Sequence, residues 1–351
     1  MSRNYTAALI GCGRMGATID DEVQDRPDSF LWLPYSHAAG YTAVEQTSLV
    51  AVSDVDAERA ETIRSRFAAT SAYTDYREMI EKERPDIVSI ATRPGTHAEI
   101  TVFAAEHGVK GIYCEKPLCC SMGEADAMVD ACLQHGVKFN YGTQRRYMPL
   151  FQSMRKMAQG GNLGRIECVI GHCGVGAAQW GHTHTTDMLL CLAGDGEVDF
   201  VQGTIVASDD DWQGNRLLTD PGISNGYIRF ANGVHGYILS GSGFEFEVSG
   251  SNGKLRSMNN GALVQWRTLT DPWNLLEERP MPEIARESGT VNGIRDIVRA
   301  LDNGVDTQGN ILLARRSQEM IFGLIASDRS GGQRVPLPLE DRDLYVGRDD
   351  W

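Results

Sequence analysis

Three glycines near the start of the sequence have the spacing of a turn that binds phosphate groups. The letters G-C-G-R-M-G at residues 11–16 directly follow Ala7–Ile10, an apolar run typical of a β-strand. In such a turn the first glycine allows a tight bend, the second lets the backbone approach a pyrophosphate, and the third lets a helix pack against the strand. The N–H groups at the start of that helix attract phosphate. We therefore expect a dinucleotide to be bound by Gly11, Gly13, Arg14, Met15 and Gly16.

An acidic residue that holds the adenosine ribose usually lies about 20 residues beyond such a turn. Asp54 ends the second strand-like run, Ser48–Ser53, but it lies 38 residues after the last glycine of the turn. Its carboxylate would accept hydrogen bonds from the ribose hydroxyls and repel a 2′-phosphate, so the sequence favours NAD over NADP. Arg59 is the residue that could weaken this preference. The alternative is that Asp54 only caps the next helix, although Asp56 is better placed for that role.

The extra length lies in a polar, proline-containing stretch, Asp20–Tyr35, which we interpret as an inserted loop. Four apolar residues, F-L-W-L at positions 30–33, gather at its tip. A polar segment with so concentrated an apolar cluster should not leave it in water. We expect the tip to pack over the substrate side or across a contact between subunits.

Two later turns also follow strand-like runs, Asp86–Ala91 and Gly111–Cys114. Ligands of open α/β sheets bind outside the carboxyl ends of the strands, so both turns should face the cofactor. Pro117 disfavours helical geometry at Lys116 and holds that residue extended at the end of its strand. Without this placement Lys116 would be interpreted as a solvated surface lysine. The expected cofactor contacts in the two turns are Thr92, Arg93, Pro94, His97, Glu115 and Lys116.

The order of these motifs resembles that of the Gfo/Idh/MocA oxidoreductases, a family that includes inositol dehydrogenase and glucose–fructose oxidoreductase. The likeness extends over nearly the whole chain, and the combination of E-K-P with the phosphate-binding turn is specific. The elements that carry the resemblance are the glycine-rich turn, the strand-ending aspartate, T-x-P-x-x-H at residues 92–97, E-K-P at 115–117, Q-R-R-Y at 144–147, H-T-T-D at 184–187 and R-V-P-L-P at 334–338.

The resemblance implies a Rossmann domain followed by a domain with a large open sheet that often forms dimers or tetramers. It also implies tightly held NAD(P) and redox chemistry on a sugar, a cyclitol or a related polyol. By motif, Lys116 is the catalytic lysine, His184 is the catalytic histidine, and Gln144 lies near the nicotinamide and contacts the cofactor. One position departs from the pattern: many members carry D-x-G-x-H, whereas this chain has Trp180 in the place of the aspartate.

Hydride transfer from a secondary alcohol requires a base that takes the hydroxyl proton, and histidine has a suitable pKa without adjustment. A nearby lysine cation would stabilise the developing alkoxide. Asp187 follows His184 by three residues, on the same side of a helix predicted over Asp187–Leu192. We therefore expect Asp187 to share in catalysis by orienting or charge-stabilising the imidazole. The alternative is that Asp187 only caps the first turn of that helix.

The neighbours of His184 leave further alternatives open. His182 is either a substrate contact or a structural residue, and Trp180 either stacks on the apolar face of a sugar or fills the core. Two histidines and Asp187 have a spacing that zinc could use, but hydride transfer needs no metal and no third strong ligand is evident, so we expect no metal site. The expected substrate contacts are Lys116, Trp180, His182 and His184.

The stretches that must position these residues change character along the chain. Up to residue 147, apolar runs alternate with helix-like stretches, which indicates parallel βαβ units in a doubly wound sheet. The last of these runs is Val137–Tyr141, and the helices are predicted over Asp56–Phe67, Asp75–Lys82, His97–His107 and Met122–His135.

From Leu163 onward, strand-like runs are separated by short Gly/Asn turns, which indicates antiparallel hairpins. We therefore predict an α/β Rossmann domain over residues 1–148 and an α+β domain with a large, mostly antiparallel open sheet over residues 149–351. The runs are Arg165–His172, Val198–Ala207, Gly226–Phe230, Val234–Leu239, Glu245–Ser249 and Leu263–Thr268, and two late helices are predicted over Val291–Leu301 and Gly309–Ser327.

Composition narrows the classes of partner. The 351 residues carry 33 Lys and Arg against 47 Asp and Glu, a formal net charge of −14, which repels nucleic-acid backbones and anionic membranes. No apolar run approaches the roughly 18 residues of a membrane-spanning helix. The sequence enters a strand-like run at once, so no signal peptide is expected. Eight cysteines without a C-x-x-C pair are typical of reduced thiols, and together these features predict a cytoplasmic protein.

Three functions fit these observations. The leading hypothesis is an NAD-dependent oxidoreductase that transfers hydride between the nicotinamide and a hydroxyl of a sugar, cyclitol or related polyol. The second keeps the same site, but transient oxidation acidifies a neighbouring C–H and allows elimination or glycoside cleavage, with NAD recycled. The third is a non-catalytic NAD-binding sensor. For all three we expect a homodimer or homotetramer, a small-molecule ligand, and no nucleic-acid or membrane partner.

Overall fold

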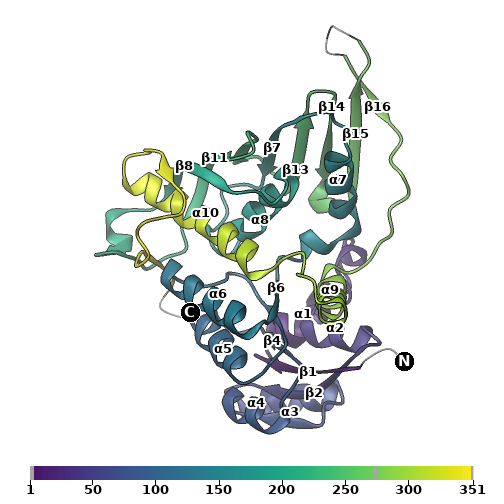
Figure 1. The fold of residues 1–351 in the computed structure, drawn as a ribbon, viewed down its shortest axis with the longest axis vertical. Coiled ribbons are helices and arrows are strands. Elements are labelled where there is room, and N and C mark those ends of the chain that lie inside the picture. Colours follow the sequence, from purple (N-terminus) through teal and green to yellow (C-terminus); the bar gives the residue numbers. More distant parts are fainter. Residues whose placement is uncertain (1–3, 272, 274, 349–350) are drawn as a thin grey trace. The chain divides into compact units, whose positions relative to one another are not determined.

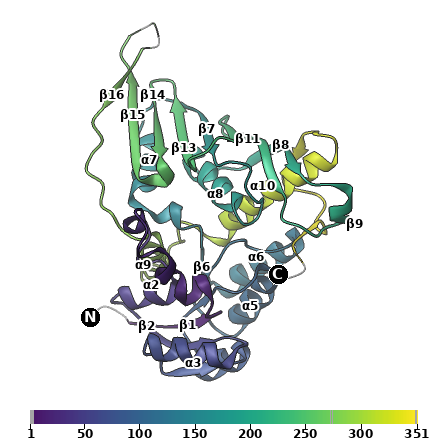
Figure 2. The ribbon, with the colours of Figure 1, turned by 180° about the vertical axis from the view of Figure 1, so that it is seen from behind.

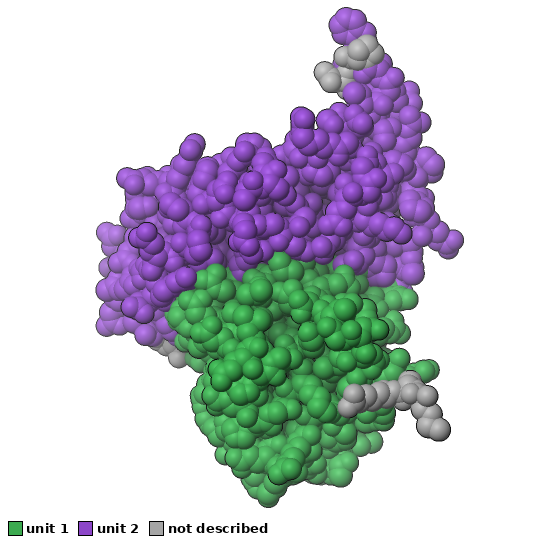
Figure 3. All heavy atoms as spheres, in the orientation of Figure 1, with its two compact units in different colours: residues 1–148, 287–315, 351 green, residues 149–286, 316–350 purple. Residues whose placement is uncertain are grey.

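The computed structural model describes residues 4–271, 273, 275–348 and 351 (Figure 1). The chain divides into two compact units (Figure 3). Unit 1 consists of residues 1–148, 287–315 and 351, and unit 2 of residues 149–286 and 316–350. The predicted second domain, residues 149–351, differs from this division in residues 287–315 and 351, which belong to unit 1.

Unit 1 is built on a parallel sheet of six strands in the order β3-β2-β1-β4-β5-β6 (Figure 1). The strands are β1 (Tyr5–Ile10), β2 (Thr47–Ser53), β3 (Ser71–Tyr73), β4 (Ile87–Ile90), β5 (Gly111–Cys114) and β6 (Lys138–Tyr141). The order reverses between β1 and β4, which is the switch point where such sheets bind ligands. The predicted doubly wound sheet is confirmed. Strand β3 was not predicted, because three half-buried residues do not form an apolar run.

Five of the seven helices described below begin where a side chain accepts a hydrogen bond from a backbone N–H that would otherwise lack a partner. The residues that cap them in this way are Ser36, Asp56, Asp75, Ser121 and Ser288. The helices are α1 (Ile19–Val23), α2 (His37–Ala43), α3 (Ala57–Arg66), α4 (Tyr76–Glu83), α5 (Pro94–Glu106), α6 (Met122–His135) and α9 (Gly289–Asn303).

Helices α2 and α9 come from opposite ends of the chain and pack against each other and against the sheet. Their buried side chains, among them Tyr41 and Ile294, belong to one apolar cluster with residues of β1, β2, β4 and β5. Gly40 allows the close approach of the two helices, since a Cβ there would lie 2.7 Å from Cδ1 of Ile294. This shared core is the physical reason that residues 287–315 fold with unit 1.

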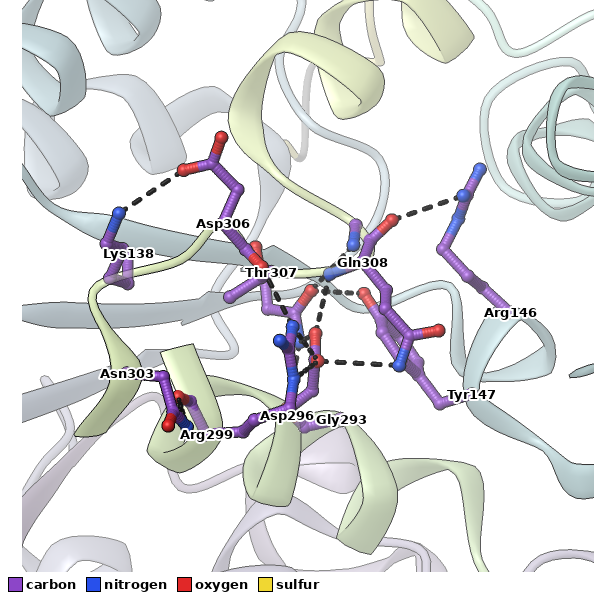
Figure 4. A network of polar contacts seen from close by, with 12 residues as sticks. Lys138, Arg146, Tyr147, Gly293, Asp296, Arg299, Asn303, Asp306, Thr307 and Gln308 are labelled. Atoms are coloured by element: carbon purple, nitrogen blue, oxygen red, sulfur yellow. Dashed lines mark hydrogen bonds and ion pairs between the residues drawn. The ribbon is translucent and has the colours of Figure 1, made fainter. Parts of the chain in front are cut away.

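A buried polar network fixes the chain that follows α9 against β6 (Figure 4). Asp296 of α9 accepts hydrogen bonds from the side chain of Asn140 on β6 and from the backbone N–H of Gln308. Asn140 accepts one in turn from the hydroxyl of Tyr147. Tyr147 closes a short 3-10 turn, Gln144–Tyr147, so the network also fixes this turn at the carboxyl end of β6.

Unit 2 contains a sheet of nine strands in the order β16-β15-β14-β13-β7-β12-β11-β8-β17. Neighbouring strands are antiparallel except for β7 and β12, and the predicted turns at residues 231–233 and 251–253 join β11 to β12 and β13 to β14. The strands are β7 (Ile166–His172), β8 (Val198–Val206), β11 (Gly222–Phe230), β12 (His235–Leu239), β13 (Glu245–Gly250), β14 (Gly253–Met258), β15 (Leu263–Leu269), β16 (Leu276–Arg279) and β17 (Val335–Pro336). A small second sheet joins β9 (Trp212–Gln213), β10 (Arg216–Leu217) and β18 (Tyr345–Val346).

Helices α7 (Pro149–Gln159), α8 (His182–Ala193) and α10 (Ile311–Arg329) lie along one face of the large sheet (Figure 2). Glycines on the strands let α8 and α10 approach closely. A Cβ at Gly171 would lie 2.8 Å from Cγ2 of Thr185 on α8, and a Cβ at Gly203 would lie 2.6 Å from Cδ2 of Leu324 on α10. The predicted open, mostly antiparallel sheet is therefore confirmed, with helices packed on one of its faces.

Two properties of the described residues bear on the composition argument. None of their helices is both long and apolar enough to cross a membrane. All eight cysteines are free thiols, and six of them are buried.

Candidate active site

The glycine-rich turn has the geometry that a pyrophosphate needs. Gly11 has a φ of +92°, and a Cβ there would lie 2.6 Å from the carbonyl oxygen of Ala91. A Cβ at Gly16 would collide with the carbonyl oxygen of Gly11. Gly13 differs, since nothing lies within 4 Å of its Cβ position. The first and third glycines therefore permit the bend and the close packing, and the second leaves open space against the backbone, which fits a bound dinucleotide.

The helix after this turn is shorter than the motif predicts. A single π-helical turn, Arg14–Thr18, is followed by α1, and the inserted stretch then leads into α2. The exposed side chain of Arg14 forms an ion pair with Glu22 of α1, with Nε and Oε2 2.7 Å apart. The cation of Arg14 thus stands beside the turn, partly neutralised by its acidic partner.

Asp54 is buried at the end of β2 and faces the glycine-rich turn. Its Oδ2 accepts a hydrogen bond from the backbone N–H of Cys12 at 2.8 Å, and its Oδ1 accepts one from Asp56 N at 3.0 Å. Asp56, not Asp54, caps α3. The guanidinium of Arg59 lies 3.2 Å from Asp54 Oδ1 and 3.4 Å from Asp56 Oδ2. Arg59 therefore does reach back to the carboxylate, as the sequence suggested it could.

A series of buried polar contacts fixes the turn after β5, and the sequence did not reveal it. Glu115 Oε2 accepts a hydrogen bond from the backbone N–H of Lys116 at 3.1 Å, and its Oε1 lies 3.0 Å from Nε2 of His37 on α2. Nδ1 of the same histidine lies 2.5 Å from the hydroxyl of Ser89 on β4. The His37 ring stacks on Tyr113, with centroids 4.6 Å apart.

Both carboxylate oxygens of Glu115 are thus engaged inside unit 1, and its expected cofactor contact stays a prediction. Burial raises the pKa of this carboxyl, but the hydrogen bond with His37 and the neighbouring Lys116 cation outweigh burial and hold the pKa below its ordinary value. Glu115 is therefore a buried anion that fixes the backbone at Lys116.

His97 joins the two turns that follow β4 and β5. Its ring is fully buried, with Nδ1 2.9 Å from the carbonyl oxygen of Pro117 and Nε2 3.2 Å from that of Thr92. Burial lowers the pKa of this imidazole. The hydroxyls of Thr92 and Thr96 lie 2.8 Å apart, and Pro94 is the first residue of α5. His97 therefore holds the two turns together through their backbone carbonyls. Arg93, just before α5, is exposed.

The inserted stretch folds onto unit 1. Of its four apolar tip residues, Leu31 and Trp32 are buried, and Phe30 is 42% exposed. The Trp32 ring stacks on Tyr35 with centroids 5.6 Å apart, and the guanidinium of Arg145 lies 5.3 Å from the Trp32 centroid. The Tyr35 hydroxyl accepts a hydrogen bond of 2.9 Å from Nε2 of Gln144, which follows β6.

In unit 2, helix α8 starts five residues before the predicted helix and buries every residue along its length. His184 is 8% exposed, and its ring meets Phe244 edge-on with centroids 6.4 Å apart. Asp187 is also buried. Because Gly181 is the N-cap of α8, Asp187 lies beyond the first turn, and the alternative that it only caps the helix is wrong.

His182 is a buried structural residue of the same helix. Its Nδ1 lies 3.1 Å from the Thr185 hydroxyl, and burial lowers its pKa to about 4. The ring is neutral at physiological pH and 1% exposed, and its expected contact with the substrate stays a prediction. Trp180 is 41% exposed, so the core alternative for it is wrong, and its ring is accessible to a ligand.

The loop that precedes α8 is held by residues that the sequence did not single out. The carboxylate of Asp220 accepts hydrogen bonds from the backbone N–H groups of Gln179 and Trp180, at 2.7 and 2.9 Å. The buried Gln179 side chain donates to the carbonyl of Val346 and accepts from Gln318, both at 2.6 Å. Among the described residues, no three His, Cys, Asp or Glu side chains are grouped so as to hold a metal ion.

Comparison with known proteins gives a family for part of the chain. Residues 5–143 match the profile of GFO_IDH_MocA, described as an oxidoreductase family with an NAD-binding Rossmann fold. The D-apiose dehydrogenase of Paraburkholderia graminis is 28% identical over 162 residues, which are 46% of this chain and 38% of that protein. The levoglucosan dehydrogenase of Pseudarthrobacter phenanthrenivorans is 36% identical over 168 residues, 47% of this chain and 39% of that protein.

These matches span about two fifths of each relative, but solved structures extend the likeness of fold. A levoglucosan dehydrogenase in complex with NADH and levoglucosan has a TM-score of 0.73 at 21% identity, covering 96% of this chain and 100% of that one. At this identity the likeness shows the fold alone.

Proposed function

We propose that the protein is an NAD-dependent dehydrogenase, because residues 5–143 match the profile of the Gfo/Idh/MocA oxidoreductases, which is described as having an NAD-binding Rossmann fold. It transfers hydride between the nicotinamide and a hydroxyl group of a sugar, a cyclitol or a related polyol. The observation that carries the proposal is the glycine-rich turn, where the Asp54 carboxylate bonds to Cys12 N and open space lies against Gly13.

The residues of unit 1 that would hold NAD lie at the carboxyl ends of its strands. The turn at residues 11–16 would receive the pyrophosphate on its backbone N–H groups. The Asp54 carboxylate, already directed at this turn, would accept hydrogen bonds from the adenosine ribose. NAD is favoured over NADP because a 2′-phosphate would meet this charge, although Arg59 reduces the repulsion. Bound NAD supplies the hydride acceptor for the reaction.

The chain's own residues would handle the proton and the developing charge. His184 accepts the proton of the substrate hydroxyl while the carbinol hydrogen leaves with its electron pair. Lys116, the family's catalytic lysine by motif, would stabilise the negative charge that develops on the substrate alkoxide. The buried carboxylate of Asp187, three residues after His184 on α8, stabilises the imidazolium that forms. Trp180 offers an exposed ring to the apolar face of a sugar.

The proposal is tested by an absorbance screen for NADH at 340 nm, with NAD and a panel of sugars, inositols and glycosides. Stoichiometric NADH formation with one substrate class supports it. Product without accumulated NADH would replace it with an internal redox cycle that eliminates or cleaves a glycoside. NAD binding with no turnover across the panel would replace it with a sensor.

We further propose that the protein is a cytoplasmic homodimer or homotetramer that takes a small molecule and binds no nucleic acid. The free thiols and the net charge of −14 support the location and the absence of a polyanionic partner. The uncovered face of the nine-stranded sheet supports self-association, since it carries tyrosine rings such as Tyr227 and Tyr237, 5.5 Å apart. Sedimentation of the purified chain at several concentrations measures the oligomeric state.

A further inference from the structure

Tyr35 is the last residue of the inserted stretch, and two helices of unit 1, α1 and α9, fix the backbone around it. The Asp20 carboxylate accepts hydrogen bonds from the N–H groups of Tyr35 and Ser36, at 2.9 and 2.8 Å. The hydroxyl of Thr290 on α9 donates to the Tyr35 carbonyl at 2.8 Å, and Ser288 donates to the carbonyl of the preceding proline. A residue held at so many points is part of a built site and not the tip of a loose loop.

The position of the Tyr35 hydroxyl follows from its neighbours. The hydroxyl bonds to Gln144, three residues after the end of β6, and the Tyr35 ring stacks on Trp32, whose ring centroid lies 5.3 Å from the Arg145 guanidinium. Burial raises the pKa of the phenol, the positive charges of Arg145 and Arg14 lower it, and the negative charge of Glu115 raises it further. These charged residues follow β6, β1 and β5, so the hydroxyl lies at the carboxyl edge of the sheet.

The direction of the dinucleotide along this edge is set by Asp54. Because Asp54 ends β2, the adenosine half lies on the β2 side of the glycine-rich turn. The nicotinamide half therefore extends past the switch point toward β4, β5 and β6. That is the side on which Gln144 follows β6 and Glu115 follows β5.

The phenol has a hydrogen-bonding capacity left for a ligand. Gln144 Nε2 is the donor in their shared hydrogen bond, so the Tyr35 O–H is not consumed by it. Within the described part of the chain, the Tyr35 hydroxyl makes this one hydrogen bond. The hydroxyl is part-buried, and an oxygen of a bound ligand would accept a hydrogen bond from its O–H.

We propose that the inserted stretch, residues 20–35, is a cofactor clamp, in which the Tyr35 hydroxyl donates a hydrogen bond to an oxygen of the nicotinamide half of NAD. The inference rests on the proposed NAD binding and adds a residue that neither the glycine motif nor the strand-end turns contain. The stack of Trp32 on Tyr35 keeps the ring in place, so the hydroxyl is oriented before the cofactor arrives.

The test is Tyr35→Phe, which removes one oxygen and keeps the ring. One hydrogen bond contributes about 0.5–1.5 kcal/mol, so the Kd for NADH, measured by fluorescence titration, should rise about 2- to 12-fold. The Kd for ADP, which lacks the nicotinamide half, should not change. The matched control is Tyr76→Phe on α4, which removes a hydroxyl that bonds to Glu99 on the surface and should leave both constants unchanged.

An unchanged Kd for NADH in Tyr35→Phe would overturn the proposal, and equal losses for NADH and ADP would place the hydroxyl on the pyrophosphate instead. An unchanged Kd for NADH with a raised KM for a polyol would assign Tyr35 to the substrate and also overturn it. The binding assay needs no substrate, so a failed polyol screen refutes the dehydrogenase and leaves the clamp standing. A wild-type protein that binds no NADH refutes both.

Discussion

Replacing His37 by phenylalanine should destabilise unit 1 by about 3–5 kcal/mol. The His37 ring is fully buried, and its two nitrogens face Glu115 Oε1 and the Ser89 hydroxyl. Phenylalanine keeps a ring that can stack on Tyr113 but has neither nitrogen. Glu115 would then be a buried anion without a partner at that oxygen, and breaking a buried charged contact from one side costs an amount of this order.

This change is large enough to measure by thermal unfolding. For a unit of about 180 residues, each kcal/mol shifts Tm by roughly 2–4 °C, so His37→Phe should lower Tm by about 6–20 °C. Circular dichroism at several scan rates provides the measurement. The matched control is His107→Phe at the exposed end of α5, which should change the free energy of unfolding by less than about 1 kcal/mol.

The sharper part of the prediction is a reversal of sign in a double-mutant cycle. Glu115→Gln in the wild-type chain removes a charge-assisted hydrogen bond and should cost about 1.5–3 kcal/mol. In the His37→Phe background the same change removes an unpaired buried charge and should raise stability. Any overpacking by the phenylalanine ring is present both in His37→Phe and in the double variant, so it cancels from the difference in their free energies of unfolding. Glu115→Gln that destabilises both backgrounds equally would refute the coupling between His37 and Glu115.

Asp54→Ala should weaken NAD binding and narrow the preference over NADP, because ribose acceptors and an opposing charge are lost together; a wild-type protein that binds NADP more tightly contradicts this assignment. His184→Ala should lower kcat by about 10²–10⁴ with little change in the Kd for NADH. Undiminished turnover would exclude His184 as the base. Lys116→Ala should also lower kcat and weaken NADH binding slightly, and a wild-type kcat would remove Lys116 from the chemistry. The pKa of His182 is lowered by burial to about 4, so between about pH 6.5 and 4 the unfolded chain binds a proton that the folded chain does not. The free energy of unfolding should therefore fall as pH drops through this window, and His182→Gln should make that fall smaller in urea titrations, while other groups such as the buried His97 still contribute.

The sequence predicted those features, such as helix caps and hairpin turns, that depend on residues close together along the chain. Asp56 was expected to cap a helix, and its side chain does accept hydrogen bonds from the backbone N–H groups of Glu58 and Arg59. The turns at residues 231–233 and 251–253 were expected to join antiparallel strands, and they do. The unit to which residues 287–315 belong was not predictable in this way. It depends on the contact of Gly40 with α9, between helices from opposite ends of the chain.

The start of α8 shows a different limit. Its N-cap, Gly181, contributes no side-chain hydrogen bond, and the first turn carries histidines and threonines with weak helix propensity. The sequence therefore predicted a helix only from Asp187. Burial of the whole helix against β7, β12 and β13 overrides the weak propensity. As a result Asp187 lies within the helix, where it can act on His184, and not at its end.

The role of Glu115 could have been predicted from the strand itself. Successive side chains of a strand point to opposite faces of the sheet, and Glu115 and Lys116 directly follow the last residue of β5, so they turn to opposite faces if this alternation continues. If Lys116 faces the ligand, Glu115 must turn toward a helix-covered face, where a buried carboxylate needs a partner. The sequence could not name that partner, because His37 lies 78 residues away and its own neighbours only indicate a helix. The alternation of side chains thus predicts that the Glu115 carboxylate is buried and needs a hydrogen-bond donor. Only the packing of α2 on the sheet identifies His37 as its partner.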